Sequence, residues 1–228
     1  MMDSLRELVP NVCVGRYRDG LVMLMSHAER VLQCPFTREE LATLETLMNR
    51  MGACMVYGYC FRDYAKLRTG FLQCERVLVL SRALRLMDTG RVNSYDRFNV
   101  YYLIDLAVQQ FIHMAGHSDI IYLIHPAIIQ ITRYDTANQT ELRDTLYYFM
   151  LNGNNVSRTA EATFMHRNTV LNRINRIRAL TGLDLEDGGL CQRLMFSCQL
   201  VQYYERVLNL PLRLDINADS STRKEDRK

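Results

Sequence analysis

The chain has 228 residues, 48% of them hydrophobic, which is enough for one large domain or two small ones with a packed core. It has no apolar run near the roughly 20 residues that cross a bilayer, and MMDSLRELVP lacks the features of a secretory signal. Seven cysteines without a Cys-x-x-Cys pair predict reduced, mostly buried thiols in a cytoplasmic protein, and a net charge of +3 indicates no polyanionic partner by itself.

The first region, residues 1–90, mixes strand-like and helical patterns. Two apolar runs in VCVGRYRDGLVMLMS enclose a polar turn at 16–20 and predict a β-hairpin. Thr37 and Glu40 have the spacing of a capping box, which predicts a helix to Met51; its apolar face comprises Leu41, Leu44, Leu47 and Met48. ACMVYGYCF predicts a short strand, and residues 62–87 predict a long helix with Leu67, Phe71, Cys74, Leu78 and Leu86 on its apolar face. This order predicts a small α+β sheet domain.

The second region, residues 91–134, is predicted to be a helical connector. Pro126 is expected to open a helix over 127–133, because proline fits the first helical turn. The remaining residues, 209–228, have mixed charge and predict a disordered tail.

The third region, residues 135–208, predicts four short helices. Asn138 and Glu141 have capping-box spacing before a helix to Leu151, and NGNN ends that helix. A second, two-turn helix follows, with Val156, Ala160 and Phe164 on its apolar side. After a tight turn at 165–166, a third helix is predicted over 168–180.

This third helix has two different faces. Val170, Ile174 and Ile177 fall together at helical spacing. The opposite face contains no acid and carries Asn168, Thr169, Asn172, Asn175 and Arg176, bordered by Arg167 and Arg173. In the major groove of DNA, arginine pairs with guanine and asparagine with adenine. Two short helices joined by a tight turn, the second with such a face, predict a helix-turn-helix.

Local charge supports the same interpretation. Residues 156–182 contain five arginines and one acid, Glu161. We therefore predict that this segment contacts DNA, with His166 and Arg158 near phosphates and the others in the groove; the predicted set is Arg158, His166, Arg167, Asn168, Thr169, Asn172, Arg173 and Arg176.

The same segment resembles the carboxy-terminal domain of the PucR/CdaR-type regulators of purine catabolism and carbohydrate diacid use. The shared features occur in order at 134–135, 140–142, 145–146, 152–155, 159–160, 166–169 and 181–185. Leu171 and Asn172 depart from the family, which usually has a basic residue and a tyrosine there, and this bears on the operator sequence. The resemblance implies a metabolite-responsive regulator that reads an operator in duplex DNA, with a recognition helix at about 167–180.

The upstream part also resembles this family. HPAIIQITRYD is similar to the lead-in of the domain, and residues 10–86 resemble a degenerate, truncated GGDEF-like domain. An active cyclase has paired acids in its hairpin, whereas this chain has only Asp19 and Gly20, and one carboxylate cannot build the magnesium site. We therefore expect no catalytic residue and no cofactor; the remnant, or the helices around 95–117, would form a homodimer.

Alternative interpretations remain open from the residues alone. The helices could form an ordinary arginine-rich bundle, a docking module for another protein, or part of a nucleotide-processing enzyme. His113 and His117 have the spacing of a zinc site, but only Asp119 lies nearby as a third ligand, so no metal is expected. Salt-dependent affinity for duplex DNA would separate a regulator from a docking module.

Overall fold

The computed structural model describes residues 2–9, 11–26, 35–61, 63–85, 90–116 and 118–210. The chain divides into two units, Met1–Leu103 and Ile104–Lys228, which are considered separately below. None of the helices in the described ranges combines the length and apolarity that a membrane crossing requires.

The first unit begins with a short helix and a hairpin. Helix α1 (Met2–Leu8), which the sequence analysis did not predict, packs on strand β1 (Val12–Tyr17). Strand β1 pairs antiparallel with β2 (Gly20–Met25) across a two-residue turn, in which Arg18 has φ 49°. The hairpin prediction is therefore confirmed, with Val12 opposite Met25.

Helix α2 (Arg38–Met51) confirms the predicted capping box. The Glu40 amide donates to Thr37 Oγ1 at 3.2 Å, and the Thr37 amide donates to Glu40 Oε2 at 2.7 Å. The helix ends at Gly52, where φ 57° suits a residue without a Cβ. Leu44 and Met48 are buried, so the predicted apolar face does point into a core.

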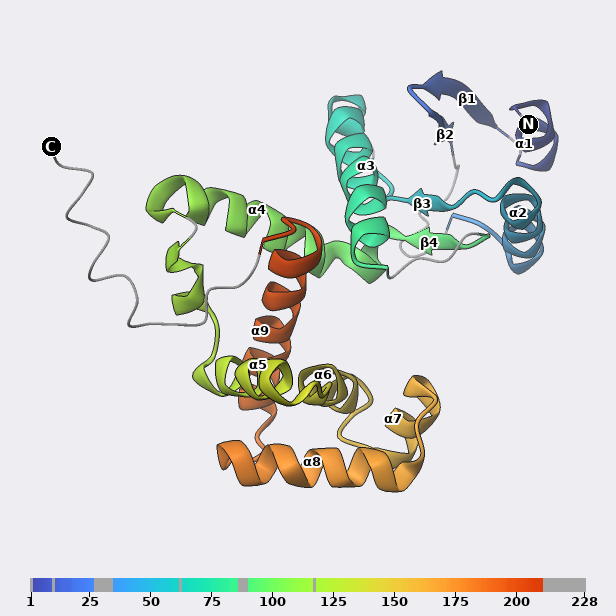
Figure 1. Cartoon of the computed structure of the whole chain (residues 1–228). Coiled ribbons are helices and arrows are strands. Elements are labelled where there is room, and N and C mark those ends of the chain that lie inside the picture. Colours follow the sequence, from blue (N-terminus) through green and yellow to red (C-terminus); the bar gives the residue numbers. More distant parts are fainter. Residues whose placement is uncertain are drawn as a thin grey trace, which may run out of the picture. The chain divides into compact units, whose positions relative to one another are not determined.

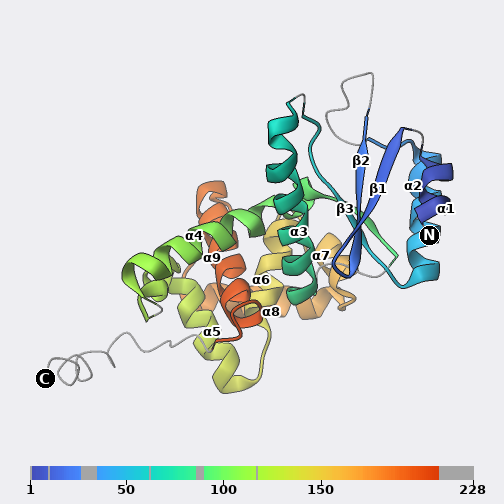
Figure 2. The ribbon, with the colours of Figure 1, turned by 90° about the horizontal axis from the view of Figure 1, so that it is seen from above.

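The second sheet joins two strands that are distant in sequence. Strand β3 (Met55–Tyr57) runs parallel to β4 (Val92–Ser94), and a 3₁₀ turn (Tyr64–Lys66) and helix α3 (Leu67–Ala83) connect them. In Figure 1 strands β3 and β4 lie between α2 and α3, and in Figure 2 the labelled strands β1, β2 and β3 lie between these helices. The hairpin and the β3–β4 pair are separate two-stranded sheets, so the described strands form no single larger sheet.

Two predictions for this unit need correction. Helix α3 is shorter than the predicted 62–87, and its buried side chains are Val77, Leu80 and Ser81 instead of the predicted stripe through Phe71 and Cys74. Strand β4 lies in a region predicted to be wholly helical. Residues 62 and 86–89 lie outside the described residues, and so does the predicted position of Leu86 on the apolar face of this helix.

The connector contains the helices that the sequence predicts. A 3₁₀ turn (Tyr95–Phe98) leads into α4 (Asn99–Ala115), which crosses the division between the units, and another 3₁₀ segment (Ser118–Leu123) follows. Within the second unit, Asp105 of α4 accepts a hydrogen bond from the buried Tyr203 hydroxyl at 2.5 Å. Tyr203 is thus a packing residue of this unit.

In the described part of the second unit, the five helices that follow the connector pack together and position the predicted helix-turn-helix. These are α5 (Pro126–Asn138), α6 (Leu142–Leu151), α7 (Val156–Thr163), α8 (Arg167–Thr181) and α9 (Gly188–Arg206). Helix α8 packs on α5, α6 and α7, while α9 packs on α5 and α6 and leaves the far side of α8 uncovered by these helices (Figure 1). Arg143 of α6 is joined to Glu205 of α9 by two hydrogen bonds of 2.9 Å.

The junction of α5 and α6 differs from the prediction. Helix α5 does begin at Pro126, but it runs to Asn138, through the boundary placed at 134/135 and beyond the predicted end at 133. Asn138 and Glu141 form no capping box, and Glu141 makes no side-chain cap. Instead, Asp135 accepts hydrogen bonds from the amides of Leu142 and Arg143 at 2.8 and 2.9 Å, which satisfies the free donors at the start of α6.

We predict that His125 makes the bundle less stable in acid. His125 Nδ1 caps α5 by accepting from the Ala127 amide at 3.2 Å. Burial, and secondarily the Arg193 guanidinium, lower the pKa of His125 from its ordinary value of 6.5. The unfolded chain therefore takes up the proton first as pH falls, so the free energy of unfolding should decrease between about pH 7.5 and 5.5.

The matched variant is His125→Asn, which keeps a capping acceptor but does not titrate. Urea denaturation followed by circular dichroism at both pH values should show a smaller pH effect in this variant than in the wild type. Equal pH effects in the two proteins would rule out His125 as the cause.

Candidate nucleic-acid interface

Helices α7 and α8 are joined by a tight turn. Phe164 ends α7 in the left-handed conformation, with φ 54°, and its amide donates to the Glu161 carbonyl. The Met165 amide then bonds to the Ala160 carbonyl, and α8 begins at Arg167. Phe164 is 99% exposed, so its predicted place on the apolar side of α7 is wrong. The turn rotates its side chain away from the bundle.

Small and branched side chains hold the two helices together. Thr159 and Ala160 of α7 are buried, and α7 packs directly on α8. Val170, Ile174 and Ile177 of α8 are almost fully buried, as the helical spacing predicts. Burying these three residues should contribute several kcal/mol and fixes which side of α8 faces outward.

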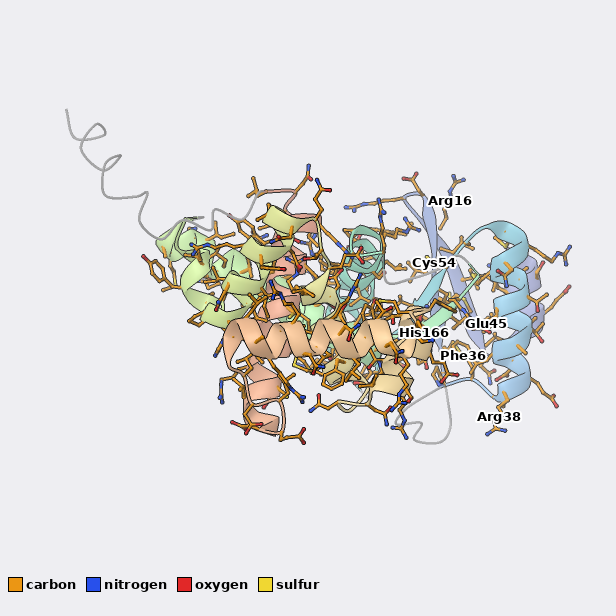
Figure 3. All side chains as sticks on the ribbon, turned by 60° about the horizontal axis from the view of Figure 1, so that its bottom comes forward. Arg16, Phe36, Arg38, Glu45, Cys54 and His166 are labelled. Atoms are coloured by element: carbon orange, nitrogen blue, oxygen red, sulfur yellow. The ribbon has the colours of Figure 1, made fainter. Side chains whose placement is uncertain are left out.

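The outward side of α8 consists largely of amide side chains. Asn168, Asn172 and Asn175 are exposed, and among the described residues none of their side chains has a hydrogen-bond partner. Thr169 and Arg167 are also exposed at the start of the helix. Figure 3, which brings this side of the bundle forward, shows His166 at the end of α8 that adjoins α7. The predicted groove face is therefore open to solvent.

Arg173 lies at the edge of this face and is held by α6. Its Nη1 donates to Thr145 Oγ1 at 2.9 Å, and Glu141 Oε2 lies 3.5 Å away. The Arg173 side chain is 27% exposed, so much of it is covered by protein. The prediction placed this residue in the groove, but in the structure its guanidinium holds α8 against α6.

Arg176 is held by α5. Its Nε and Nη2 donate to the Tyr134 hydroxyl at 3.2 and 3.1 Å, and the guanidinium lies 5.2 Å from the centre of the Tyr134 ring. These contacts combine hydrogen bonding with a cation–π interaction. Arg176 remains exposed as a residue, so it adds positive charge at the edge of the outward face.

The other basic residues near this face are not held in the same way. Arg158 of α7 and Arg167 of α8 are exposed, and no described residue accepts a hydrogen bond from either side chain. Arg178 lies 3.9 Å from Glu186, at the opposite end of α8. Positive charge available to a polyanion is therefore concentrated at the start of α8 and on α7.

His166 caps the start of α8. Its Nδ1 accepts a hydrogen bond from the Asn168 amide at 3.3 Å. A ring nitrogen that accepts carries no proton, so the neutral ring has its proton on Nε2. That Nε2 is then available as a donor at the exposed end of the helix.

Two motifs that flank the helix-turn-helix are hydrogen-bonded to each other. Asn154, in the left-handed conformation with φ 59°, donates from Nδ2 to the Leu185 carbonyl at 2.6 Å. Leu185 is buried, and Gly182 ends α8 with φ 67°. The asparagine-rich break and the closing Thr-Gly-Leu-Asp-Leu thus meet in space. Both motifs are visible in the sequence, but their contact was not predicted because Asn154 and Leu185 lie 31 residues apart.

The sequence also offered a histidine pair and seven cysteines as candidate site residues. No group of three potential metal ligands occurs within the described ranges; His113 is exposed and His117 lies outside them. The cysteines differ in burial: Cys191 and Cys198 are buried, whereas Cys13 and Cys60 are exposed. The prediction of mostly buried thiols is therefore wrong for Cys13 and Cys60. Burial raises the pKa of Cys198 to about 12.

Comparison with known families supports the helix-turn-helix. Residues 142–200 match the PucR C-terminal helix-turn-helix domain, which covers α6 to most of α9. Searches of curated proteins and of solved structures gave no match for this chain. A PucR-type helix-turn-helix domain indicates a DNA-binding transcriptional regulator.

We predict energetic coupling between Arg173 and Thr145. Thr145 is buried, and its hydroxyl accepts from Arg173 while it donates to the Glu141 carbonyl, so removing either partner of the Arg173–Thr145 pair loses one hydrogen bond. In a double-mutant cycle with Arg173→Met and Thr145→Val, the coupling free energy should be about 1 kcal/mol. The matched control, Arg167→Met with Thr145→Val, should show coupling near zero. Equal coupling in both cycles would contradict the contact.

Proposed function

We propose that this chain is a sequence-specific transcriptional regulator that places the first turns of α8 in the major groove of duplex DNA. The observation that carries the proposal is the outward face of α8, which is acid-free, exposed and rich in amides. The match of residues 142–200 to the PucR helix-turn-helix domain supports it. The first residues of a recognition helix are those that usually contact base edges.

Within this proposal the predicted contact residues take different roles. Arg158, Arg167 and the Nε2 of His166 are placed to contact phosphates, which fix the protein on the duplex. Asn168, Thr169 and Asn172 face the bases. Arg173 and Arg176, which bind Thr145 and Tyr134, contribute mainly by holding α8 and by their charge at the edge of the face.

A homodimer is part of the proposal, since helix-turn-helix proteins usually bind paired half-sites. Its interface is proposed on α4. One face of this helix carries four large apolar side chains that are 40–75% exposed: Val100, Leu103, Leu106 and Met114. A solvated helix normally presents polar groups on such a face, so a second copy of this helix is a suitable cover.

Regulation by a metabolite, a GGDEF-like origin of residues 1–90 and a cytoplasmic location are also proposals. The first unit has an open hollow of about 340 Å³ between the hairpin and α3, lined mostly by apolar side chains such as Val22, Leu24 and Phe71. Among the described residues that line it, Arg16 alone is charged. This lining favours an apolar effector over a nucleotide, because a nucleotide triphosphate needs several cations or a metal.

The first test is binding to duplex DNA as a function of salt. The purified full chain should bind random duplexes with an affinity that falls steeply with salt, because phosphate contacts release counterions. Arg158→Ala and Arg167→Ala should weaken binding to all sequences alike and each reduce the slope of log K against log salt by about 1.

Arg85→Ala, an exposed arginine of the first unit, is the matched control and should leave the slope unchanged. Salt-independent or absent DNA binding would overturn the proposal and favour the docking-module alternative. Magnesium-dependent turnover of a nucleoside triphosphate would instead favour an enzyme.

The second test concerns the dimer. Leu103→Glu with Leu106→Glu places charges in the proposed apolar interface, so sedimentation equilibrium should report single chains instead of pairs. Leu151→Glu, which changes an exposed leucine of α6, should leave the pairs intact. A wild-type protein that sediments as a single chain at every concentration would contradict dimerisation through α4.

A further inference from the structure

We propose that Asn168, Asn172 and Asn175 form an amide row that reads adenines in neighbouring base pairs, so that the operator half-site is rich in A·T pairs. This inference rests on the proposed function, since it specifies what the outward face of α8 recognises. It adds Asn175 to the contact residues and assigns base reading to amides instead of arginines.

The three residues are spaced to meet one strip of the groove. They stand at i, i+4 and i+7 in α8, which is the spacing of side chains along one face of a helix. At about 1.5 Å of rise per residue, the row spans roughly 10 Å along the helix. Successive base pairs are about 3.4 Å apart, so the row matches a stretch of about three base pairs.

The amides are available, whereas the arginines beside them are engaged. No described residue hydrogen-bonds the side chains of Asn168, Asn172 or Asn175. Arg173 and Arg176 are both held by other helices, through Thr145 of α6 and Tyr134 of α5. Two arginines that would otherwise read guanine are therefore positioning residues that fix the rotation of α8.

Three asparagines in one helix need an explanation, because asparagine is a weaker helix former than alanine or leucine. Within the described residues their side chains cap no helix and form no hydrogen bond, and all three are exposed, so packing in a core does not explain them. An amide offers one donor and one acceptor side by side, which matches N7 and the N6 amino group of adenine in the major groove.

The position of Leu171 also favours A·T pairs in the half-site. Leu171 is 42% exposed and lies three residues after Asn168 and four before Asn175, at the border of the amide row. An exposed apolar side chain among base-reading amides suits the methyl group of thymine, the partner of adenine. The amides and the leucine together therefore fit A·T pairs better than G·C pairs.

The test is binding-site selection from random duplexes with the full chain, followed by the same selection with single variants. The wild type should enrich half-sites with A·T pairs at clustered positions. Asn168→Ala, Asn172→Ala and Asn175→Ala should each relax the preference at one position and lower affinity for the selected duplex about tenfold or more. Asn172→Arg should change one preferred adenine to guanine.

The matched control is Gln192→Ala, an exposed amide on α9, which should leave both the selected sequence and the affinity unchanged. Thermal melting by circular dichroism checks that each variant is folded. If the wild type binds no duplex, the proposed function fails and this inference fails with it. If the wild type binds with steep salt dependence but the asparagine variants select the same sequence, only the amide row is overturned.

Discussion

The burial of Val170, Ile174 and Ile177 is the constraint on which the interface depends. These side chains hold α8 against α5, α6 and α7, and the helical period then sends the asparagines to the opposite side. Arg173 and Arg176 secure the same rotation from the two edges of the helix, through Thr145 and Tyr134. The same apolar contacts thus stabilise the bundle and determine which side chains of α8 face outward.

The sequence predicted the elements whose causes are local. The Thr37–Glu40 capping box, the hairpin, Pro126 at the start of α5 and the two faces of α8 all depend on residues a few positions apart. The same capping pattern gave a wrong prediction at Asn138 and Glu141. Asn138 is the last residue of α5, and the free amides at the start of α6 donate to Asp135 instead. Strand β4 was missed because three residues give no pattern and its partner, β3, is distant in sequence.

The site shows the same division between local and distant causes. The exposure of the asparagines and the burial of the isoleucines follow from periodicity alone. The partners of Arg173 and Arg176 lie 28 and 42 residues away, so no local signal separates a groove arginine from one that anchors a helix. Phe164 was misplaced for a related reason: helical periodicity was extended one residue past the end of α7, where the chain turns left-handed.

The hydrogen bond from Asn154 to the Leu185 carbonyl closes a loop between positions 31 residues apart. The segment that contains α7 and α8 therefore begins and ends at neighbouring points of the bundle, and the hydrogen bond joins its two ends. Replacement of this segment by one that keeps the inward apolar residues, Arg173 and Arg176 would change the outward face of α8 and leave its contacts with α5 and α6 in place.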